Sequence, residues 1–349
     1  MNWTQQLLRW YIEHQRSFPW RTTKDPYRIW LSEIILQQTR TEQGIPYYLK
    51  FLNAFPTVVS LAEADEDLVL KLWQGLGYYS RARNLHATAR RVAEEYQGVF
   101  PKTFHELKDL KGVGDYTASA VGSICFDLPE AVVDGNVYRF LSRYFGIETP
   151  IDQAAAHKIF KEKANHLMDV NNPGQFNQAL MEFGSLQCTP KNTSCNRCPF
   201  QMSCHAFNHD AVDKFPVKLK KIKVSKRYFN YLVVAAQNDE TLMEQRTKKG
   251  IWQQLYQFPL VESSENINTP EFIKKHNPLE ILNNQPYTIT QWNTVPITHK
   301  LSHQHLSITF WILKTDIKLP NGLGYFQVNQ LAVPIVLQKF IEKYFIDNT

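Results

Sequence analysis

The sequence predicts two domains of different class, an all-α domain followed by an α+β domain. At 349 residues the chain is long enough for each domain to bury its own core. Before Cys204 the apolar residues recur at helical spacing, as in Leu68, Leu72 and Leu76. From Leu306 to Ile312 they alternate strictly, which is typical of a half-buried strand. The fold class is therefore multidomain, α and then α+β.

The predicted boundaries are residues 1–206 for the helical domain, 207–227 for a linker and 228–349 for the second domain. The linker is basic: from Lys214 to Arg227 the chain has no acidic residue. Such a run either lies over phosphates or is simply a solvated charged segment. In the second domain, residues 228–236 are rich in β-formers, and residues 336–345 form an amphipathic helix.

Composition narrows the class of partner. A net charge of +6 and a pI near 8.9 suit nucleic acid, although a mildly basic enzyme of any kind has the same balance. No apolar run has the length of a membrane span, and no secretory signal is present. The first 14 residues contain Arg9 and Glu13 and read as a structural helix rather than a presequence. We expect a cytoplasmic protein that does not contact a membrane.

Four cysteines, Cys188, Cys195, Cys198 and Cys204, lie within 17 residues with the spacing C-x6-C-x2-C-x5-C. Four thiolates this close in sequence can surround one inorganic centre. A structural zinc site typically has paired C-x2-C units, so a 4Fe-4S cluster is the leading prediction, with zinc and disulfides as alternatives.

Residues 110–118 place a Gly-x-Gly turn between two helical segments. Glycines let the backbone turn tightly and approach a ligand, and the amides that open the next helix attract anions. Lys111, Gly112, Val113 and Gly114 are therefore predicted to bind a phosphate. An ordinary connection between two helices is the alternative.

About twenty residues later, Val132-Val133-Asp134-Gly135-Asn136 precedes another helix. This turn, this aspartate and the four-cysteine loop, in that order, resemble the helix-hairpin-helix DNA glycosylases of the endonuclease III superfamily, which carry an iron-sulfur cluster. Residues 19–21, 30–39 and 75–85 are similar to adenine DNA glycosylases (the MutY family), which remove adenine mispaired with 8-oxoguanine. The resemblance implies base excision repair by base flipping in duplex DNA, with the protein acting as a monomer associated with DNA in the bacterial cytoplasm.

Excision of a base requires a proton on the leaving base and negative charge near the developing sugar cation. Glu33 lies on a predicted helix among Ile29, Ile34 and Leu36, and desolvation there raises a carboxyl pKa. Asp134 opens a helix, where unpaired amides favour the ionised form. From these patterns alone, Asp134 is equally a plain helix cap and Glu33 a partner for Arg28.

The resemblance assigns roles to these residues. Glu33 is the acid that protonates the adenine at N7, Asp134 stabilises or captures the sugar cation, and Asn136 and Tyr116 assist around the sugar. Bifunctional relatives have a lysine at the position of Tyr116, and a phenol cannot form their Schiff base. We therefore expect a monofunctional enzyme. The alternatives are a bifunctional pyrimidine-lesion glycosylase with lyase activity and a non-enzymatic iron-sulfur DNA-binding protein.

The resemblance also implies residues that read the lesion. Gln38, Thr39, Leu76 and Tyr78 match positions that intercalate beside and read 8-oxoguanine, and Arg21 and Gln178 resemble residues of the adenine pocket. Residues 250–259 resemble a Nudix-like recognition domain, whose metal-binding glutamate cluster is missing here. Ser302 and His303 match its recognition loop, in which Leu301 replaces the usual phenylalanine.

Overall fold

The computed structural model describes residues 2–219 and 224–346, except residues 268, 272, 274–278, 280–281 and 283–284. The chain divides into two compact units. The first comprises Met1–Ala64 and Arg83–Lys220, and the second comprises Asp65–Ala82 and Lys221–Thr349. Lys220, Lys221 and Lys223 of the predicted basic linker lie outside the described residues.

The first unit is built from helices, as the apolar spacing predicts. In chain order they are α1 (Trp3–His14), η1 (Pro19–Thr22), α2 (Pro26–Leu36), α3 (Thr41–Ala54), α4 (Val58–Ala62), α6 (Ser80–Glu95, which begins in the second unit), α7 (Phe104–Asp109), α8 (Asp115–Phe126), α9 (Gly135–Phe145), α10 (Ala154–Leu167), α11 (Pro173–Leu186), η2 (Cys195–Arg197), η3 (Gln201–Ser203), α12 (His205–Asn208) and η4 (Val212–Lys214).

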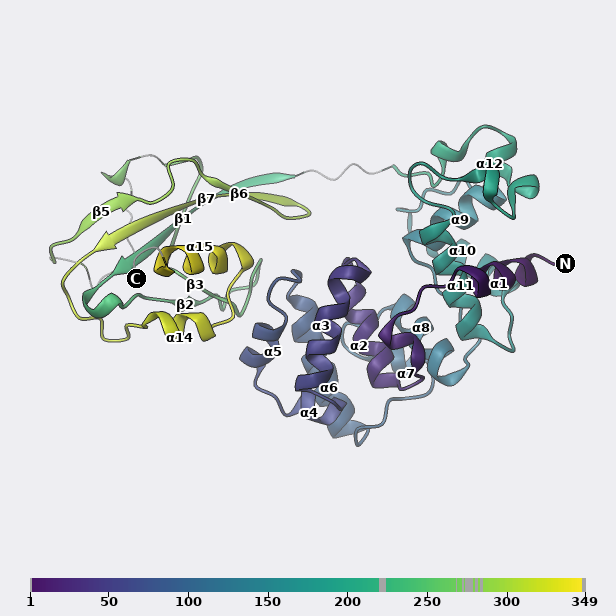
Figure 1. Cartoon of the computed structure of the whole chain (residues 1–349), viewed down its shortest axis with the longest axis horizontal. Helices are drawn as coiled ribbons and strands as arrows, with labels where there is room; N and C mark the ends of the chain where they lie inside the picture. Colours follow the sequence, from purple (N-terminus) through teal and green to yellow (C-terminus); the bar gives the residue numbers. More distant parts are fainter. Residues whose placement is uncertain are drawn as a thin grey trace. The chain divides into compact units, whose positions relative to one another are not determined.

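Helix α11 lies at the centre of one half of this unit, where it packs against α1, α8 and α9 (Figure 1). The core between them is aromatic. Phe140 of α9 lies 4.3 Å from Phe183 of α11, measured between ring centroids, and Trp3 of α1 stacks on Phe140 at 5.6 Å. Burial of such large side chains is worth about 2 kcal/mol each. This packing fixes α11 against the start of α9, where the candidate site lies.

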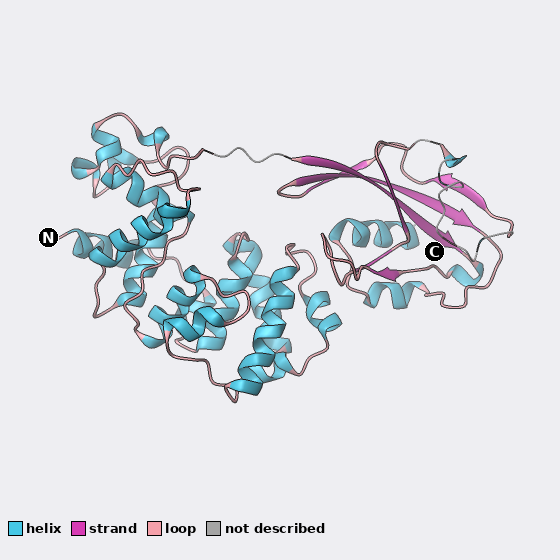
Figure 2. Ribbon diagram, turned by 180° about the vertical axis from the view of Figure 1, so that it is seen from behind, coloured by secondary structure: helices cyan, strands magenta, loops and turns pink. Residues whose placement is uncertain are grey.

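The second unit contains a five-stranded mixed sheet in the order β4-β1-β7-β5, with β6 also paired to β7 (Figure 2). Its elements are α5 (Glu66–Leu72), β1 (Ser225–Ala235), η5 (Gln237–Asp239), β2 (Glu244–Gln245), β3 (Tyr256–Gln257), β4 (Leu260–Ser263), β5 (Thr288–Gln291), β6 (Ile297–Lys300), β7 (Gln304–Lys314), α14 (Tyr325–Gln330) and α15 (Ile335–Ile346). Strands and helices in one unit confirm the predicted α+β class.

The long strands β1 and β7 run parallel and pair from Ser225 and Gln304 to Ala235 and Lys314. Because side chains alternate between the faces of a sheet, Phe310 faces α15, where it stacks on Phe340 at 3.8 Å. Its neighbour Trp311 belongs to the core of the opposite face. Both faces of the central strands are therefore covered.

The segment Asp65–Ala82 groups with the second unit, whereas its helical pattern had placed it in the helical domain. The Lys71 ammonium donates hydrogen bonds to the carbonyls of Asn329 and Leu331, at 2.7 and 3.0 Å. The Gln74 amide donates to Gln338 at 2.6 Å. Apolar periodicity predicts a helix but not the partner against which the helix packs, so sequence alone could not reveal this docking.

Candidate active site

One cavity of the first unit, of about 440 Å³, brings together the predicted catalytic residues and several of the predicted substrate-binding residues. It is lined by residues from η1, α2, α3, α8, α9 and α11 and from the loops beside them. Seven predicted residues are among them: Arg21, Glu33, Thr39, Tyr116, Asp134, Asn136 and Gln178. These positions span more than 150 residues of sequence, so only the packing of the helices brings them together.

Glu33 lies on α2. The N-cap of this helix is Asp25, whose carboxylate accepts a hydrogen bond from the Tyr27 amide at 2.9 Å. The Glu33 side chain lines the cavity, yet the residue is only 8% exposed. Burial raises the pKa of Glu33 to about 7, and the negative charge of Asp134 adds to this rise. A hydrogen bond from Tyr116 and the positive charge of Arg21 oppose it. Arg28, the alternative partner in the sequence, pairs with Asp25 instead, at 3.5 Å.

Asp134 is the N-cap of α9. Its carboxylate accepts hydrogen bonds from the amides of Asn136 and Val137, at 2.9 and 2.8 Å, and from the Asn136 side chain at 2.7 Å. Burial raises the pKa of Asp134, and these three donors oppose the rise. Each donor requires an acceptor oxygen, which favours the ionised carboxylate. Burial therefore acts on both Glu33 and Asp134, but of these two only Asp134 has a full set of donors.

Tyr116, in the first turn of α8, lies beside both carboxyls. Burial raises its pKa well above the usual value, and the charges of Glu33 and Asp134 add to this rise. Its hydroxyl also lies 3.2 Å from the Met181 sulfur of α11. The phenol therefore remains protonated and can donate a hydrogen bond.

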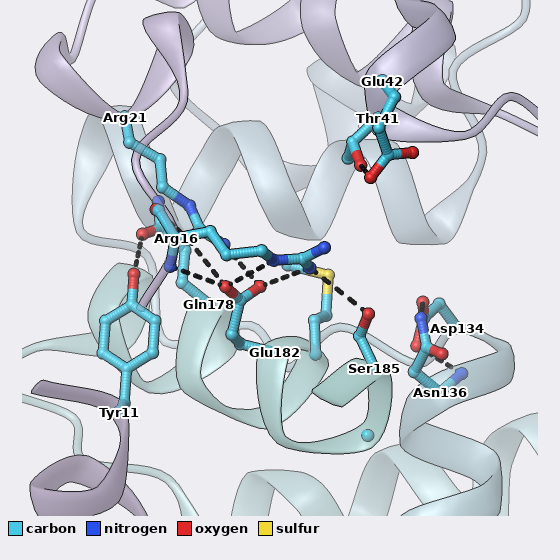
Figure 3. Close-up of polar contacts among 12 residues, drawn as sticks. Tyr11, Arg16, Arg21, Thr41, Glu42, Asp134, Asn136, Gln178, Glu182 and Ser185 are labelled. Carbon is cyan, nitrogen blue, oxygen red and sulfur yellow. Dashed lines mark hydrogen bonds and ion pairs between the residues drawn. The ribbon is translucent and has the colours of Figure 1, made fainter. Parts of the chain in front are cut away.

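A third carboxylate of the cavity, Glu182 of α11, was missed by the sequence analysis. It is 2% exposed and is bound by the guanidinium groups of Arg16 and Arg21, each with an N–O distance of 2.9 Å (Figure 3). Its two arginine partners lower the pKa of Glu182 to about 2 although burial opposes them. A signal was present: Glu182 follows Gln178 by four residues, so both lie on one face of α11.

The predicted lesion-reading residues do not all line this cavity. Thr39 does, whereas Gln38, with a left-handed φ of 56°, lies outside the lining. Leu76 is buried and Tyr78 is 46% exposed. Both belong to the second unit, in which the Tyr78 hydroxyl hydrogen-bonds the Ser302 hydroxyl. His303 is exposed, and its carbonyl accepts a hydrogen bond from the Ser225 amide at 3.0 Å.

The Gly-x-Gly turn joins α7 to α8 as predicted. Gly112 has a φ of +78°, and an added Cβ would lie 2.7 Å from Cβ of Asn84. Glycine is therefore required at this position for both backbone conformation and space. Gly114 is the N-cap of α8 and makes no side-chain cap, so the first amides of α8 have no side-chain acceptor there. Lys111 is exposed next to them, and Val113 is buried.

The four cysteines follow α11 in a loop with two short 3-10 helices. Burial raises the pKa of Cys198 to about 12, and the nearby thiols of Cys188, Cys195 and Cys204 add to the rise. Within the part of the chain that the structure describes, no three His, Cys, Asp or Glu residues are arranged to hold a single metal ion. A four-iron cluster binds each thiolate at a different iron and so requires wider spacing than one ion does.

Two buried arginines of α9 hold this loop, and Arg139 also bonds a residue of the cavity. Arg139 donates to the carbonyl of Cys188 at 2.7 Å and to the Asn136 side chain at 2.8 Å. Arg143 lies 3.5 Å from the Cys188 sulfur and donates to the Thr189 carbonyl at 2.7 Å. The cysteine loop and the residues beside Asp134 are therefore held by the same helix.

Comparison with known proteins agrees with this geometry. Residues 31–166 match the model of the HhH-GPD superfamily base excision DNA repair proteins, and residues 230–343 match that of the NUDIX domain. The structure of a thermostable thymine-DNA glycosylase superposes with a TM-score of 0.56 and 30% identity, covering 59% of this chain and 95% of that one. A non-covalent endonuclease III–DNA complex, at TM-score 0.52 and 19% identity, shares the fold. The chain is a helix-hairpin-helix base excision repair protein with a NUDIX domain.

Its relatives define the family more narrowly. An adenine DNA glycosylase of Buchnera aphidicola subsp. Baizongia pistaciae is 33% identical over 351 residues, which cover 97% of this chain and 95% of the relative. That of the subspecies Schizaphis graminum is 38% identical over 278 residues, 78% of each chain. The chain belongs to the adenine DNA glycosylase family. The predicted resemblance and fold class are confirmed.

Proposed function

We propose that this chain is a monofunctional DNA glycosylase that removes adenine mispaired with 8-oxoguanine or guanine in duplex DNA. The observation that carries the proposal is one cavity lined by both the buried carboxyl of Glu33 and the carboxylate of Asp134 that caps α9. Its volume of about 440 Å³ is that of a small-ligand pocket, sufficient for an extruded base.

The two carboxyls divide the work of breaking the N-glycosidic bond. Glu33, with a pKa of about 7, holds a proton near neutral pH and delivers it to N7 of the adenine. The electron pair of the glycosidic bond leaves with the base, and Asp134 stabilises or captures the resulting sugar cation. Water then adds at the sugar carbon, where it displaces the Asp134 carboxylate if an ester has formed, and its proton passes to the Glu33 carboxylate that the first step left ionised. Tyr116 and Asn136 orient the groups around the sugar, and Arg21 and Gln178 contact the adenine.

Tyr116 supports a monofunctional reaction. A lyase step requires an amine that attacks the sugar carbon to form a Schiff base. Among the cavity-lining residues of the described chain there is no lysine. We therefore propose hydrolysis alone, in preference to a bifunctional pyrimidine-lesion glycosylase.

The residues outside the cavity bind and read the DNA. Lys111, Gly112, Val113 and Gly114 bind a phosphate at the start of α8, where amides and the helix dipole favour an anion. Gln38, Thr39, Leu76, Tyr78, Ser302 and His303 read the 8-oxoguanine. In support, Tyr78 and Ser302, more than 220 residues apart in sequence, are hydrogen-bonded in one unit. On this proposal residues 1–206 form the catalytic domain, 207–227 the linker and 228–349 the lesion-recognition domain.

Cys188, Cys195, Cys198 and Cys204 fit a 4Fe-4S cluster. Burial raises the pKa of Cys198, and the neighbouring thiols of Cys188, Cys195 and Cys204 add to the rise, so four thiolates in this space require the positive charge of a metal centre. The cluster would fold the loop from Cys188 to Cys204 and supply no step of the reaction.

Among the helices of the described residues, none is long and apolar enough to cross a membrane. We propose a monomer associated with DNA in the bacterial cytoplasm.

An excision assay tests the proposal. Duplexes carrying adenine opposite 8-oxoguanine, guanine or thymine are incubated with the protein and then treated with alkali. Strand breaks at the mispaired adenine, and only after alkali, are expected. The variant Glu33→Gln should bind the duplex normally and excise about 100-fold or more slowly, because an amide cannot donate the proton. Near-normal single-turnover rates for this variant would remove Glu33 from its role.

A further inference from the structure

Glu182 is the most completely bonded carboxylate of the cavity. It accepts hydrogen bonds from the backbone amide, Nε and Nη2 of Arg16, each at 2.9 Å. It also accepts hydrogen bonds from Nη1 and Nη2 of Arg21, at 3.2 and 2.9 Å. A charge this deeply buried persists only where donors replace the water that it has lost. The five donated bonds supply that replacement, so Glu182 remains ionised.

The same bonds hold both guanidiniums against Glu182, as Figure 3 shows, and both arginines line the cavity. Arg16 also donates to the Ser185 hydroxyl at 3.2 Å. Arg21 also donates to the Arg16 carbonyl at 2.7 Å, and its guanidinium carbon lies 4.8 Å from the centroid of the Phe18 ring. Among the residues that the structure describes, Glu182 is the one acceptor that both arginines share, so its loss would remove the ion pairs that hold the two guanidiniums together.

Glu182 also balances charge in the cavity. The groups that act on Glu33 are Tyr116 of α8, Asp134 at the start of α9 and Arg21 of η1, and Arg21 favours the ionised form. Glu182 itself faces Arg16 and Arg21, and Arg16 additionally interacts with the exposed Glu42. With Glu182 neutral, the charge of Arg21 next to Glu33 would be uncompensated.

We propose that Glu182 is a positioning residue for base excision: its carboxylate holds Arg16 and Arg21 in place and screens their charge from Glu33. This inference deepens the proposed function and rests on it. It separates two consequences of a substitution at Glu182, namely lost geometry, which lowers the rate at every pH, and lost charge, which changes the pH at which Glu33 stops working.

The experiment compares single-turnover adenine excision from pH 5 to 9 in the wild type, Glu182→Gln and Glu182→Asp. The control is Glu13→Gln, which removes a carboxylate that pairs with an exposed arginine, Arg9, at 3.4 Å. In E182Q, the fall in rate on the alkaline side should move about one pH unit lower, since an uncompensated cation at close range favours ionised Glu33. At alkaline pH, where both rates are falling, E182Q should therefore be about tenfold slower than the wild type at the same pH. Any loss of geometry would add a further decrease at every pH.

E182D retains the charge but shortens the side chain, so its rate should fall at all pH values while the alkaline limb stays in place. If E182Q does not fold by circular dichroism, E182D decides: an unchanged rate would overturn the inference. A lowered E182Q rate with an unmoved alkaline limb would also overturn it. A wild-type protein that excises no adenine would instead overturn the proposed function, and the inference with it.

Discussion

Glu33→Gln should make the helical unit more stable at alkaline pH. Burial raises the pKa of Glu33 from 4.5 to about 7, so the folded state binds this proton more tightly than the unfolded state does. Between these two values the folded chain holds more protons, and its stability therefore falls as the pH rises. At about 1.4 kcal/mol per pKa unit, ionisation of Glu33 costs about 3 kcal/mol once the pH exceeds 7. A glutamine of nearly the same size does not ionise, so the variant does not lose this stability.

The assay is denaturant unfolding of the wild type and of Glu33→Gln at pH 5 and pH 8. At pH 5 the two should differ little, because Glu33 is mostly protonated in the folded state and the amide resembles the neutral acid. At pH 8 the variant should be more stable by about 3 kcal/mol. The control Glu63→Gln changes an exposed carboxyl of the same unit and should show no such gain. An equal gain at both pH values, or none at pH 8, would refute the reasoning.

Three further predictions concern the turn, the reaction class and the second unit. Gly112→Ala should destabilise the first unit by at least about 1–2 kcal/mol and weaken duplex binding, since the φ of Gly112 is +78° and the added methyl would lie 2.7 Å from Asn84. The control Gly114→Ala, whose methyl has no neighbour within 4 Å, should destabilise the unit less. Equal losses of stability in the two variants would contradict this account. Borohydride added during turnover should trap little protein on DNA, and efficient trapping would show a lyase. Deletion of residues 228–349 should leave adenine excision but reduce the preference for 8-oxoguanine over guanine, which duplexes with each partner would measure; an unchanged preference would assign that unit another purpose.

Local signals in the sequence predict much of this site. The apolar neighbours of Glu33 predict its burial, and the turn before α9 predicts that Asp134 is a cap. Both signals come from residues within one or two helical turns. The grouping of Asp65–Ala82 with the second unit has no such signal, because Lys71 docks on carbonyls about 260 residues later. The spacing of Glu182 from Gln178 places both on one face of α11, but nothing local reveals its partners Arg16 and Arg21, which precede it by 166 and 161 residues.

Glu33 and Glu182 show why the chemical type of a residue does not determine its protonation. Both are glutamates that line one cavity, and both are buried, yet the pKa of Glu33 rises to about 7 and that of Glu182 falls to about 2. Burial favours the neutral acid in each case, and the difference is the two arginines that contact Glu182. A pair of arginines shared by both carboxyls would keep Glu33 ionised and without a proton to give. The cavity can therefore hold a protonated acid and fixed cations together only because Glu182 forms the ion pairs with Arg16 and Arg21.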